Sequence, residues 1–175
     1  APYAKEGDVT IRITAKYSRN AADETDIITP LIEKIKQRLG DAVYSTENEE
    51  LKEVAARLLM ENNISTALAE SCTGGLLTSM LTEIPGISKV LDRAVVSYSN
   101  RAKIEELGVR QSTLENFGAV SKETAVEMAE GIRRVSGTDI GVAVTGIAGP
   151  DGGTEEKPVG LVYVALSSSR GTSFR

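Results

Sequence analysis

The spacing of apolar residues changes along the chain, and in the first part of the sequence it predicts a strand followed by a helix. Apolar and polar residues alternate over residues 9–13, as in a half-buried strand. Apolar residues then recur at helical spacing over residues 27–39. Pro30 either opens this helix behind a Thr29 cap or kinks a longer helix that starts near Ala21, and the sequence leaves both alternatives open.

These elements, with a short edge strand expected at residues 42–44, make a small α/β piece over residues 1–46. A piece of this size buries too little apolar surface to be stable alone, so we interpret it as the tail of an upstream domain. The chain begins at Ala1 rather than at Met, which leads us to expect a fragment of a longer protein. A second domain is predicted over residues 47–175.

In this second domain, runs typical of strands alternate with runs typical of helices. The alternation predicts an α/β fold, namely a three-layer α/β/α sandwich with a mostly parallel sheet, whose last strands could be antiparallel. The predicted strands cover residues 64–69, 94–98, 140–145 and 159–166. The predicted helices are one that is capped by Thr46 or Asn48 and ends at Asn62–Asn63, and others over residues 73–84, 101–107, 113–117 and 122–135, the last capped by Ser121.

Functional sites of such folds lie at the carboxyl ends of strands, and three segments of this chain follow predicted strands in that way. They are residues 71–75, 98–103 and 146–160. The first segment changes abruptly from an apolar strand to a serine, a cysteine, a threonine and two glycines, followed by the next apolar run. A sharp strand-to-helix turn of this kind exposes a nucleophile, here Ser71, beside the free N–H groups at the start of the 73–84 helix. The alternative is an ordinary helix cap.

Composition limits the chemistry that Ser71 could use. The chain has no His and a single Cys, which excludes a Ser-His-Asp triad, a Cys-His pair and a His-built metal site within one chain. We predict no metal ion and no cofactor. Cys72 is a competing nucleophile, ranked below Ser71 because no His is present to form an ion pair with its thiolate.

Charge and hydropathy bear on location and partners. The net charge is −5, and no basic stripe with interleaved aromatic residues is present, so nucleic acid is not an expected partner. The sequence has no apolar signal segment at its start and no long apolar run. We therefore expect a cytoplasmic location and no membrane partner.

The second segment supplies a candidate base. Tyr98 closes a predicted strand, and Lys103 lies about one turn into the helix that follows. A lysine activates a serine only where burial or nearby positive charge lowers its pKa toward neutrality, and a tyrosine hydroxyl beside it could relay the proton. The alternative is a solvated helix lysine and an interfacial tyrosine.

The third segment, residues 146–160, contains five glycines and two prolines in 15 residues. Backbone N–H groups of such a loop could bind a phosphate or a carboxylate, with Glu155 and Glu156 facing solvent. It is not a P-loop, because no Gly-Lys-Ser/Thr follows. A purely structural Ω-type loop is the alternative.

Four motifs in order resemble the C-terminal domain of CinA proteins: Ala-Glu-Ser-Cys-Thr-Gly-Gly at 69–75, Tyr-Ser-Asn-x-x-Lys at 98–103, Gly-Ala-Val-Ser at 118–121 and Thr-Gly-Ile-Ala-Gly-Pro-Asp-Gly-Gly at 145–153. The resemblance implies hydrolysis of nicotinamide mononucleotide to nicotinate mononucleotide and ammonia, with Ser71 as nucleophile, Lys103 as its base and Tyr98 as the third catalytic partner. The residues expected to contact this nucleotide substrate are Cys72, Thr73, Gly74, Gly75, Asn100, Thr145, Gly146, Gly149, Gly152 and Gly153.

The resemblance extends to the first part of the chain. Residues 1–45 are similar to the small KH-like domain that precedes the amidase, but they lack the Gly-x-x-Gly loop of RNA-binding KH modules, so RNA binding is not implied. In the family, the strand that begins near Thr172 continues into a Gly-Asp-Arg segment, whose Arg is expected to bind the substrate phosphate, and then into a terminal helix. The resemblance also implies a homodimer for the full-length protein. The alternative function is a catalytically silent nucleotide-binding or regulatory domain.

Overall fold

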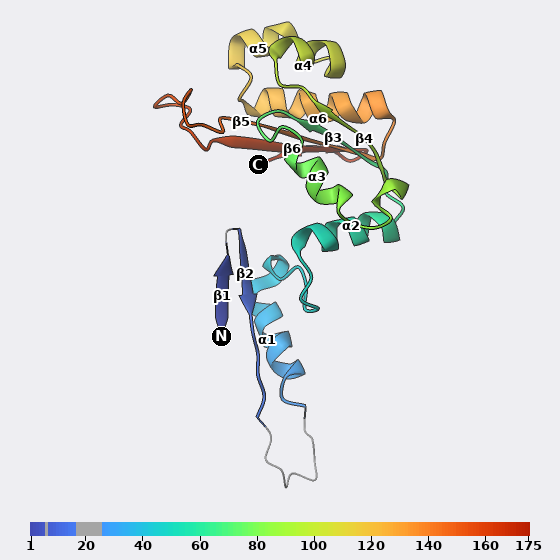
Figure 1. Ribbon diagram of the computed structural model, residues 1–175, viewed down its shortest axis with the longest axis vertical. Helices are drawn as coiled ribbons and strands as arrows, with labels where there is room; N and C mark the ends of the chain where they lie inside the picture. Colours follow the sequence, from blue (N-terminus) through green and yellow to red (C-terminus); the bar gives the residue numbers. More distant parts are fainter. Residues whose placement is uncertain (6, 17–25) are drawn as a thin grey trace. The chain divides into compact units, whose positions relative to one another are not determined.

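A computed structural model describes residues 1–5, 7–16 and 26–175 of the chain, which divides into two compact units, residues 1–54 and residues 55–175 (Figure 1). In the first unit, β1 (Pro2–Lys5) pairs antiparallel with β2 (Asp8–Ile11), and α1 (Thr29–Leu39) and the 3-10 turn η1 (Gly40–Ala42) follow. The second unit contains α3 (Leu76–Thr82), η2 (Ile87–Lys89), α4 (Asn100–Leu107), α5 (Gln111–Phe117), α6 (Lys122–Ser136), β3 (Thr66–Glu70), β4 (Leu91–Val96), β5 (Ile140–Gly146), β6 (Val162–Ser168) and β7 (Gly171–Phe174). The remaining helix, α2 (Leu51–Glu61), spans the division between the units.

The structure of the first unit differs from the prediction in two respects. The edge strand expected at residues 42–44 is wrong, because the chain there turns through η1, and β1 was not predicted, because its extended form comes from pairing with β2 rather than from an apolar pattern. Helix α1 begins at Thr29, with Pro30 in its first turn. Its first N–H groups are bound by the carboxylate of Asp26 rather than by a Thr29 cap. The alternative start near Ala21 lies outside the described residues.

The first unit has almost no core of its own. None of the described residues of β1, β2 and α1 is fully buried, and apolar side chains such as Val9, Ile27 and Leu39 are about half exposed or more. The hydroxyl of Tyr44 donates a hydrogen bond to Asp8, which is one of the few long-range polar contacts in this unit. The unit therefore buries little apolar surface, and its instability in isolation stays a prediction.

The second unit is an α/β domain built on a five-strand sheet with the order β4-β3-β5-β6-β7. Strands β4 and β5 both pair parallel with β3, whereas β6 pairs antiparallel with β5 and β7 with β6. The sheet is therefore mixed: four of its five strands run in one direction, as the prediction of a mostly parallel sheet requires, and the last strands pair antiparallel, which is the alternative that the sequence left open. Within the described residues, no helix is long and apolar enough to cross a membrane.

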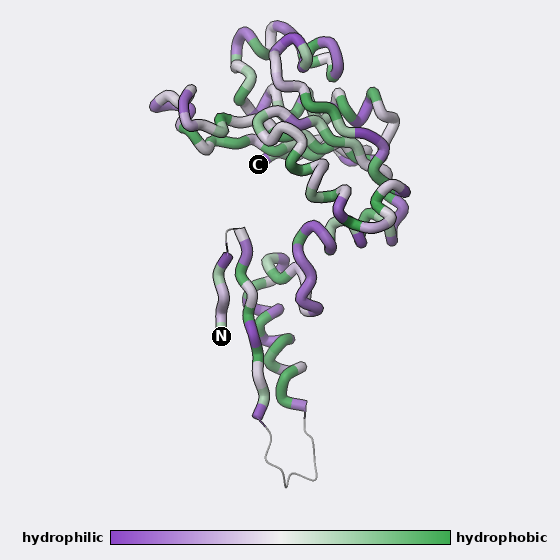
Figure 2. The backbone as a smooth tube through the Cα atoms, in the orientation of Figure 1, coloured by the Kyte–Doolittle hydropathy of each residue, from purple (hydrophilic) through white to green (hydrophobic). Residues whose placement is uncertain are grey.

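Helices cover both faces of this sheet, as the three-layer prediction requires. Helix α6 packs on one face, with α4 and α5 against it, and α3 and α2 lie on the opposite face (Figure 1). Figure 2 shows apolar residues concentrated in the strands and polar residues in the outer turns. The core on the α6 face includes Ala67, Leu107, Met128, Ile132, Ala143 and Ala165, and the core on the α3 face includes Ala56, Leu68, Leu81, Ile87 and Val90.

Helix boundaries differ most where the candidate nucleophile lies. Helix α3 was predicted to begin at residue 73 but begins at Leu76, because Gly74 and Gly75 have φ of +59° and +104° and form a left-handed turn before it. The predicted cap Ser121 binds the N–H group of Thr124, and Ser99, which was not predicted as a cap, binds the N–H group of Ala102 in the same way. No cap role is seen for Thr46 or Asn48 in the described structure; instead, the Glu53 carboxylate accepts the N–H of Glu50 just before α2.

Candidate active site

Strand β3 carries the candidate nucleophile directly at its carboxyl end. All five residues of β3 are buried, because the strand lies between β4 and β5 and under helices on both faces. The Ser71 N–H donates to Val144 O at 2.9 Å, so the serine immediately follows the last pairing of the strand. Ser71 is only 7% exposed. The sheet thus fixes the backbone of the nucleophile.

Helix α4 brings Lys103 to the same place. The lysine is 1% exposed, and its Nζ lies 3.0 Å from Ser71 Oγ, 2.7 Å from Ser97 O and 3.4 Å from Tyr98 O. The Ser99 cap starts α4 directly after β4, which directs Lys103 back toward the strand ends. The side chains of Ser71 and Lys103, which were predicted to meet only through the fold, are within hydrogen-bonding distance.

Burial lowers the pKa of Lys103 below its ordinary value, and the nearby Cys72 opposes this to a smaller extent. A neutral lysine has two N–H groups and one lone pair. In the structure Lys103 Nζ donates to Ser71 Oγ and to the carbonyl oxygens of Ser97 and Tyr98. In the neutral form the two carbonyl oxygens can accept its two N–H groups, which leaves its lone pair free to accept from the Ser71 hydroxyl. The geometry therefore suits proton transfer from serine to lysine.

Glu70 is a buried residue of this site to which the sequence analysis gave no role. It is 0% exposed, and its carboxylate accepts hydrogen bonds from the N–H groups of Gly75, Leu77 and Thr78 at 3.1, 3.0 and 2.8 Å and from the Thr78 hydroxyl at 2.5 Å. The N–H groups at the start of the predicted 73–84 helix were expected to stabilise an oxyanion; Glu70 occupies those of Gly75, Leu77 and Thr78, whereas the N–H of Thr73 is not among them. The feature of the sequence that could have indicated a role for Glu70 is that it is a charged residue at the end of an otherwise apolar predicted strand.

The thiol of Cys72 is half-buried beside the nucleophile. Burial raises its pKa; hydrogen bonds from the N–H groups of Cys72 and Thr73 and the charge of Lys103 act in the opposite direction without outweighing it. The thiol therefore stays protonated near neutral pH, which favours Ser71 over Cys72 as nucleophile.

Tyr98 and Asn100 lie at the outer edge of the site. Tyr98 contacts Lys103 through its backbone carbonyl, whereas its side chain is 74% exposed and its hydroxyl makes no hydrogen bond within the described residues. Asn100 is the first residue of α4 and is exposed. It borders a pocket of about 480 Å³ that contains neither Ser71 nor Lys103 and is lined by Asn100, Arg101, Ile104, Glu105, Gln111, Leu114 and Glu115.

The glycine-rich loop of residues 146–160 is held by its own packing. A Cβ added at Gly146, Gly149 or Gly153 would lie 2.5–2.7 Å from an atom of the returning chain, and Gly152 has φ of +90°. In the described residues no hydrogen bond joins this loop to Ser71 or Lys103. The loop instead emerges from the carboxyl end of β5, beside β3 (Figure 1).

Two side chains attach this region to the connection between α5 and α6. Lys157 Nζ donates to Phe117 O at 2.7 Å and to Val120 O at 2.8 Å. Thr145, which is 1% exposed, donates its hydroxyl to Ala119 O at 2.8 Å. Thr145 thus has a structural contact, and Lys157 is a loop anchor that the sequence analysis did not identify.

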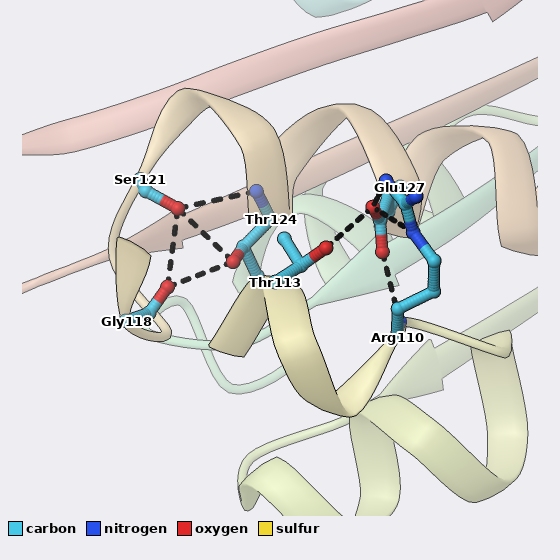
Figure 3. Close-up of polar contacts among 6 residues, drawn as sticks. All are labelled: Arg110, Thr113, Gly118, Ser121, Thr124 and Glu127. Carbon is cyan, nitrogen blue, oxygen red and sulfur yellow. Dashed lines mark hydrogen bonds and ion pairs between the residues drawn. The ribbon is translucent and has the colours of Figure 1, made fainter. Parts of the chain in front are cut away.

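The Gly-Ala-Val-Ser motif at residues 118–121 forms that connection (Figure 3). Gly118 O accepts hydrogen bonds from the hydroxyls of Ser121 and Thr124, and Ser121 Oγ also accepts the Thr124 N–H. The motif therefore ends α5 and caps α6, the helix that supports the sheet behind the site.

Comparisons with known proteins identify the family of this chain. Residues 48–175 match the CinA C-terminal domain, and residues 1–45 match the damage-inducible protein CinA KH domain. The chain belongs to the CinA family. The resemblance seen in the four sequence motifs is thereby confirmed.

Relatives of this CinA chain are longer than the chain itself. A protein from Acetivibrio thermocellus that carries the name competence-damage inducible protein is 61% identical over 175 residues, which are 100% of this chain and 42% of the relative. A CinA-like protein from Kosmotoga olearia is 50% identical over 166 residues, which are 95% of this chain and 40% of the relative. The chain thus spans about 40% of the length of these relatives.

Solved structures of the family share the fold. The competence/damage inducible protein CihA from Agrobacterium tumefaciens is 45% identical, with a TM-score of 0.68 over 75% of this chain and 82% of that one. A competence or damage-inducible protein from Enterobacter asburiae is 39% identical, with a TM-score of 0.69 over 72% of this chain and 79% of that one.

Proposed function

We propose that this CinA chain carries an amidohydrolase site that converts nicotinamide mononucleotide to nicotinate mononucleotide and ammonia. The proposal rests on one observation, the buried Lys103 Nζ that lies 3.0 Å from Ser71 Oγ in a chain without His. A serine and a lysine in this arrangement support acyl transfer. The substrate follows from the resemblance of the four motifs to the family's C-terminal domain.

In the first half of the reaction, the Ser71 hydroxyl gives its proton to neutral Lys103 while Oγ bonds to the carboxamide carbon. The tetrahedral intermediate then loses its C–N bond. The Lys103 ammonium returns the proton to the leaving nitrogen, so ammonia departs and an ester to Ser71 remains. The carbonyl oxygens of Ser97 and Tyr98 support both charge states of the lysine by accepting its N–H groups.

The oxyanion needs donors other than the start of α3, and the turn supplies two. We assign the N–H groups of Cys72 and Thr73 to this role, because among the described residues they donate to no backbone carbonyl and no carboxylate, and they lie beside the Cys72 thiol next to the nucleophile. In the second half, a water molecule gives a proton to Lys103 and bonds to the ester carbon. Lys103 then returns this proton to Ser71 Oγ as the bond from the carbon to Oγ breaks, which releases nicotinate mononucleotide and restores the serine and the neutral lysine.

Tyr98 and the glycine-rich loop are assigned to the substrate. The backbone carbonyl of Tyr98 contacts Lys103 and its side chain is exposed, so we assign the ring to stacking on the nicotinamide ring or its hydroxyl to the leaving ammonia. The loop of residues 146–160 lies at the carboxyl end of the neighbouring strand, and its N–H groups are candidate ligands of the phosphate.

Ammonia release from nicotinamide mononucleotide is the direct test, measured on the full-length protein and on the 175-residue chain, with mass spectrometry to identify nicotinate mononucleotide. Ser71→Ala is the blank, and nicotinamide without ribose phosphate tests whether the nucleotide part is recognised. Release that is lost in Ser71→Ala supports the proposal. Binding of the nucleotide without any release would instead establish the silent nucleotide-binding alternative.

A further inference from the structure

Glu70 occupies a junction between the two halves of the Ser71–Lys103 pair. Its side chain binds the start of α3, as described above, and its carbonyl oxygen accepts the Ser97 N–H at 2.8 Å. Ser97 O in turn accepts Lys103 Nζ at 2.7 Å. Glu70 therefore contacts both the turn that presents the nucleophile and the strand end that holds the base.

We infer that Glu70 is a positioning residue for the nucleophile, whose buried carboxylate holds the turn of residues 71–75 so that the Ser71 hydroxyl faces Lys103. This inference rests on the proposed function, because it assigns Glu70 a part in the same acyl transfer. The carboxylate does not touch the substrate carbon in this scheme. It acts by fixing the backbone on both sides of Ser71 and the direction of the N–H groups of Cys72 and Thr73.

The chemistry of the contacts requires a carboxylate. Both oxygens of Glu70 are used as acceptors: one by Gly75 and Leu77, the other by the N–H and hydroxyl of Thr78. A glutamine at this position would present an NH₂ group to donors in either amide orientation, so about half of these bonds would be lost. A buried carboxylate is costly unless it is fully hydrogen-bonded, and here the turn supplies that bonding.

Glu70→Gln is the test variant, and Glu127→Gln is its matched control. Glu127 is a largely buried carboxylate that also binds the start of a helix, accepting the Arg110 N–H at 2.8 Å and the Thr113 hydroxyl at 2.7 Å, but it lies on α6 in contact with α5 (Figure 3). Both variants weaken the bonds of a carboxylate to the start of a helix, and Glu127 in addition pairs with the Arg110 guanidinium. Only Glu70→Gln changes the turn that carries the nucleophile.

Two rates are measured in the full-length protein at a temperature where circular dichroism shows each variant folded. One is the rate of steady-state ammonia release. The other is the rate at which a small sulfonyl fluoride modifies Ser71, measured by mass spectrometry of the intact protein, with Ser71→Ala as the blank. Because displacement of a reacting group by about 1 Å costs up to ~10²-fold in rate, we expect Glu70→Gln to lower kcat and the labelling rate by about 10- to 100-fold, with KM within about threefold. Glu127→Gln should change both rates by less than about twofold.

The outcomes separate this inference from the proposed function. Both rates of Glu70→Gln within threefold of wild type, or equal losses in Glu127→Gln, would overturn the positioning role. If the reagent labels wild-type Ser71 but no ammonia is released, the amidase proposal is rejected. The positioning role of Glu70 is then still tested by comparing the labelling rates of Glu70→Gln and wild type. No labelling of wild type would overturn the inference, because no activated serine would exist to be positioned.

Thr78→Ala provides a second route if Glu70→Gln does not fold. It removes one of the four donors to the carboxylate and leaves the charge in place. We expect roughly a twofold to tenfold loss of kcat and of labelling at unchanged KM. Unchanged rates in a folded Thr78→Ala would count against the inference.

Discussion

Replacing Lys103 with Met separates the chemistry of the buried lysine from its contribution to the fold. Met has a similar length but no charge and no donor, so Ser71 loses its base and Ser97 O loses a hydrogen bond of 2.7 Å. Loss of a positioned general base lowers rates by about 10²–10⁴-fold. This corresponds to about 3–5 kcal/mol in the barrier to acylation. Lys103→Arg should not restore the rate, because a guanidinium stays protonated and cannot act as a base.

The same substitution changes how stability depends on pH. Burial lowers the pKa of Lys103 in the folded state, so between that pKa and the unfolded value near 10.4 the unfolded chain binds more protons than the folded one. In this window the stability of the wild type rises with pH, by at most about 1.4 kcal/mol per pH unit for one proton. Below the folded pKa the wild type bears the full cost of a buried ammonium, which Lys103→Met avoids.

Urea unfolding of both proteins from pH 7 to pH 10 measures this effect. The stability advantage of Lys103→Met over wild type should shrink as pH rises through the window, and the turnover of wild type should rise with pH over the same range as the lysine becomes neutral. The raised pKa of Cys72 makes the free energy of unfolding fall with pH, which is opposite to the effect of Lys103. Because Cys72 is present in both proteins, its effect largely cancels when the free energies of unfolding of wild type and Lys103→Met are subtracted. A difference independent of pH, or a Lys103→Met variant with turnover within threefold of wild type, would refute the reasoning.

Three further predictions concern the nucleophile, the core and the loop. Ser71→Ala should lower turnover by several orders of magnitude with little change in nucleotide affinity, whereas Cys72→Ala should keep most of the activity; the reverse result would make the thiol the nucleophile. Gly131→Ala should lower the free energy of unfolding by about 1–3 kcal/mol in urea titrations, because its Cβ would lie 2.0 Å from a carbonyl oxygen of α4, and an unchanged midpoint would contradict this. Lys157→Met should release the loop of residues 146–160, so a Glu-specific protease should cut at residues 155–156 several-fold faster; an unchanged rate would show that Lys157 does not anchor it.

The meeting of Ser71 and Lys103 could be predicted from the sequence because it follows from topology. Ser71 comes directly after β3, Lys103 lies one turn into the helix that follows β4, and the carboxyl ends of neighbouring parallel strands lie about 5 Å apart at one edge of a sheet. The cap at Ser121 was also predicted, since it is a serine directly before an amphipathic run, whereas the cap at Ser99 was not.

Other features depended on long-range contacts that no local pattern contains. The role of Glu70 depends on donors five to eight residues further along a turn whose shape is set by two left-handed glycines. The antiparallel pairing of β6 with β5 depends on how the chain returns after the loop of residues 146–160. The alternation of apolar residues predicts a strand but contains no information on its direction. The contact of Lys157 with the α5–α6 connection joins residues 37 and 40 positions apart.

The order of the strands explains why the site lies where it does. From the carboxyl end of β3 the chain leaves to α3 on one face of the sheet, and from the carboxyl end of the adjacent β4 it leaves to α4, which packs with α6 on the opposite face. Connections that diverge in this way leave a gap between neighbouring strand ends, where α/β proteins bind ligands. Ser71 follows one of these strands, and Lys103 reaches back from the helix that follows the other. A lysine that is one turn into α4 can thus be almost fully buried and still meet a serine 32 residues earlier. In a chain without His, that burial lowers the pKa of the lysine, which is the direction that the proposed role as a base requires.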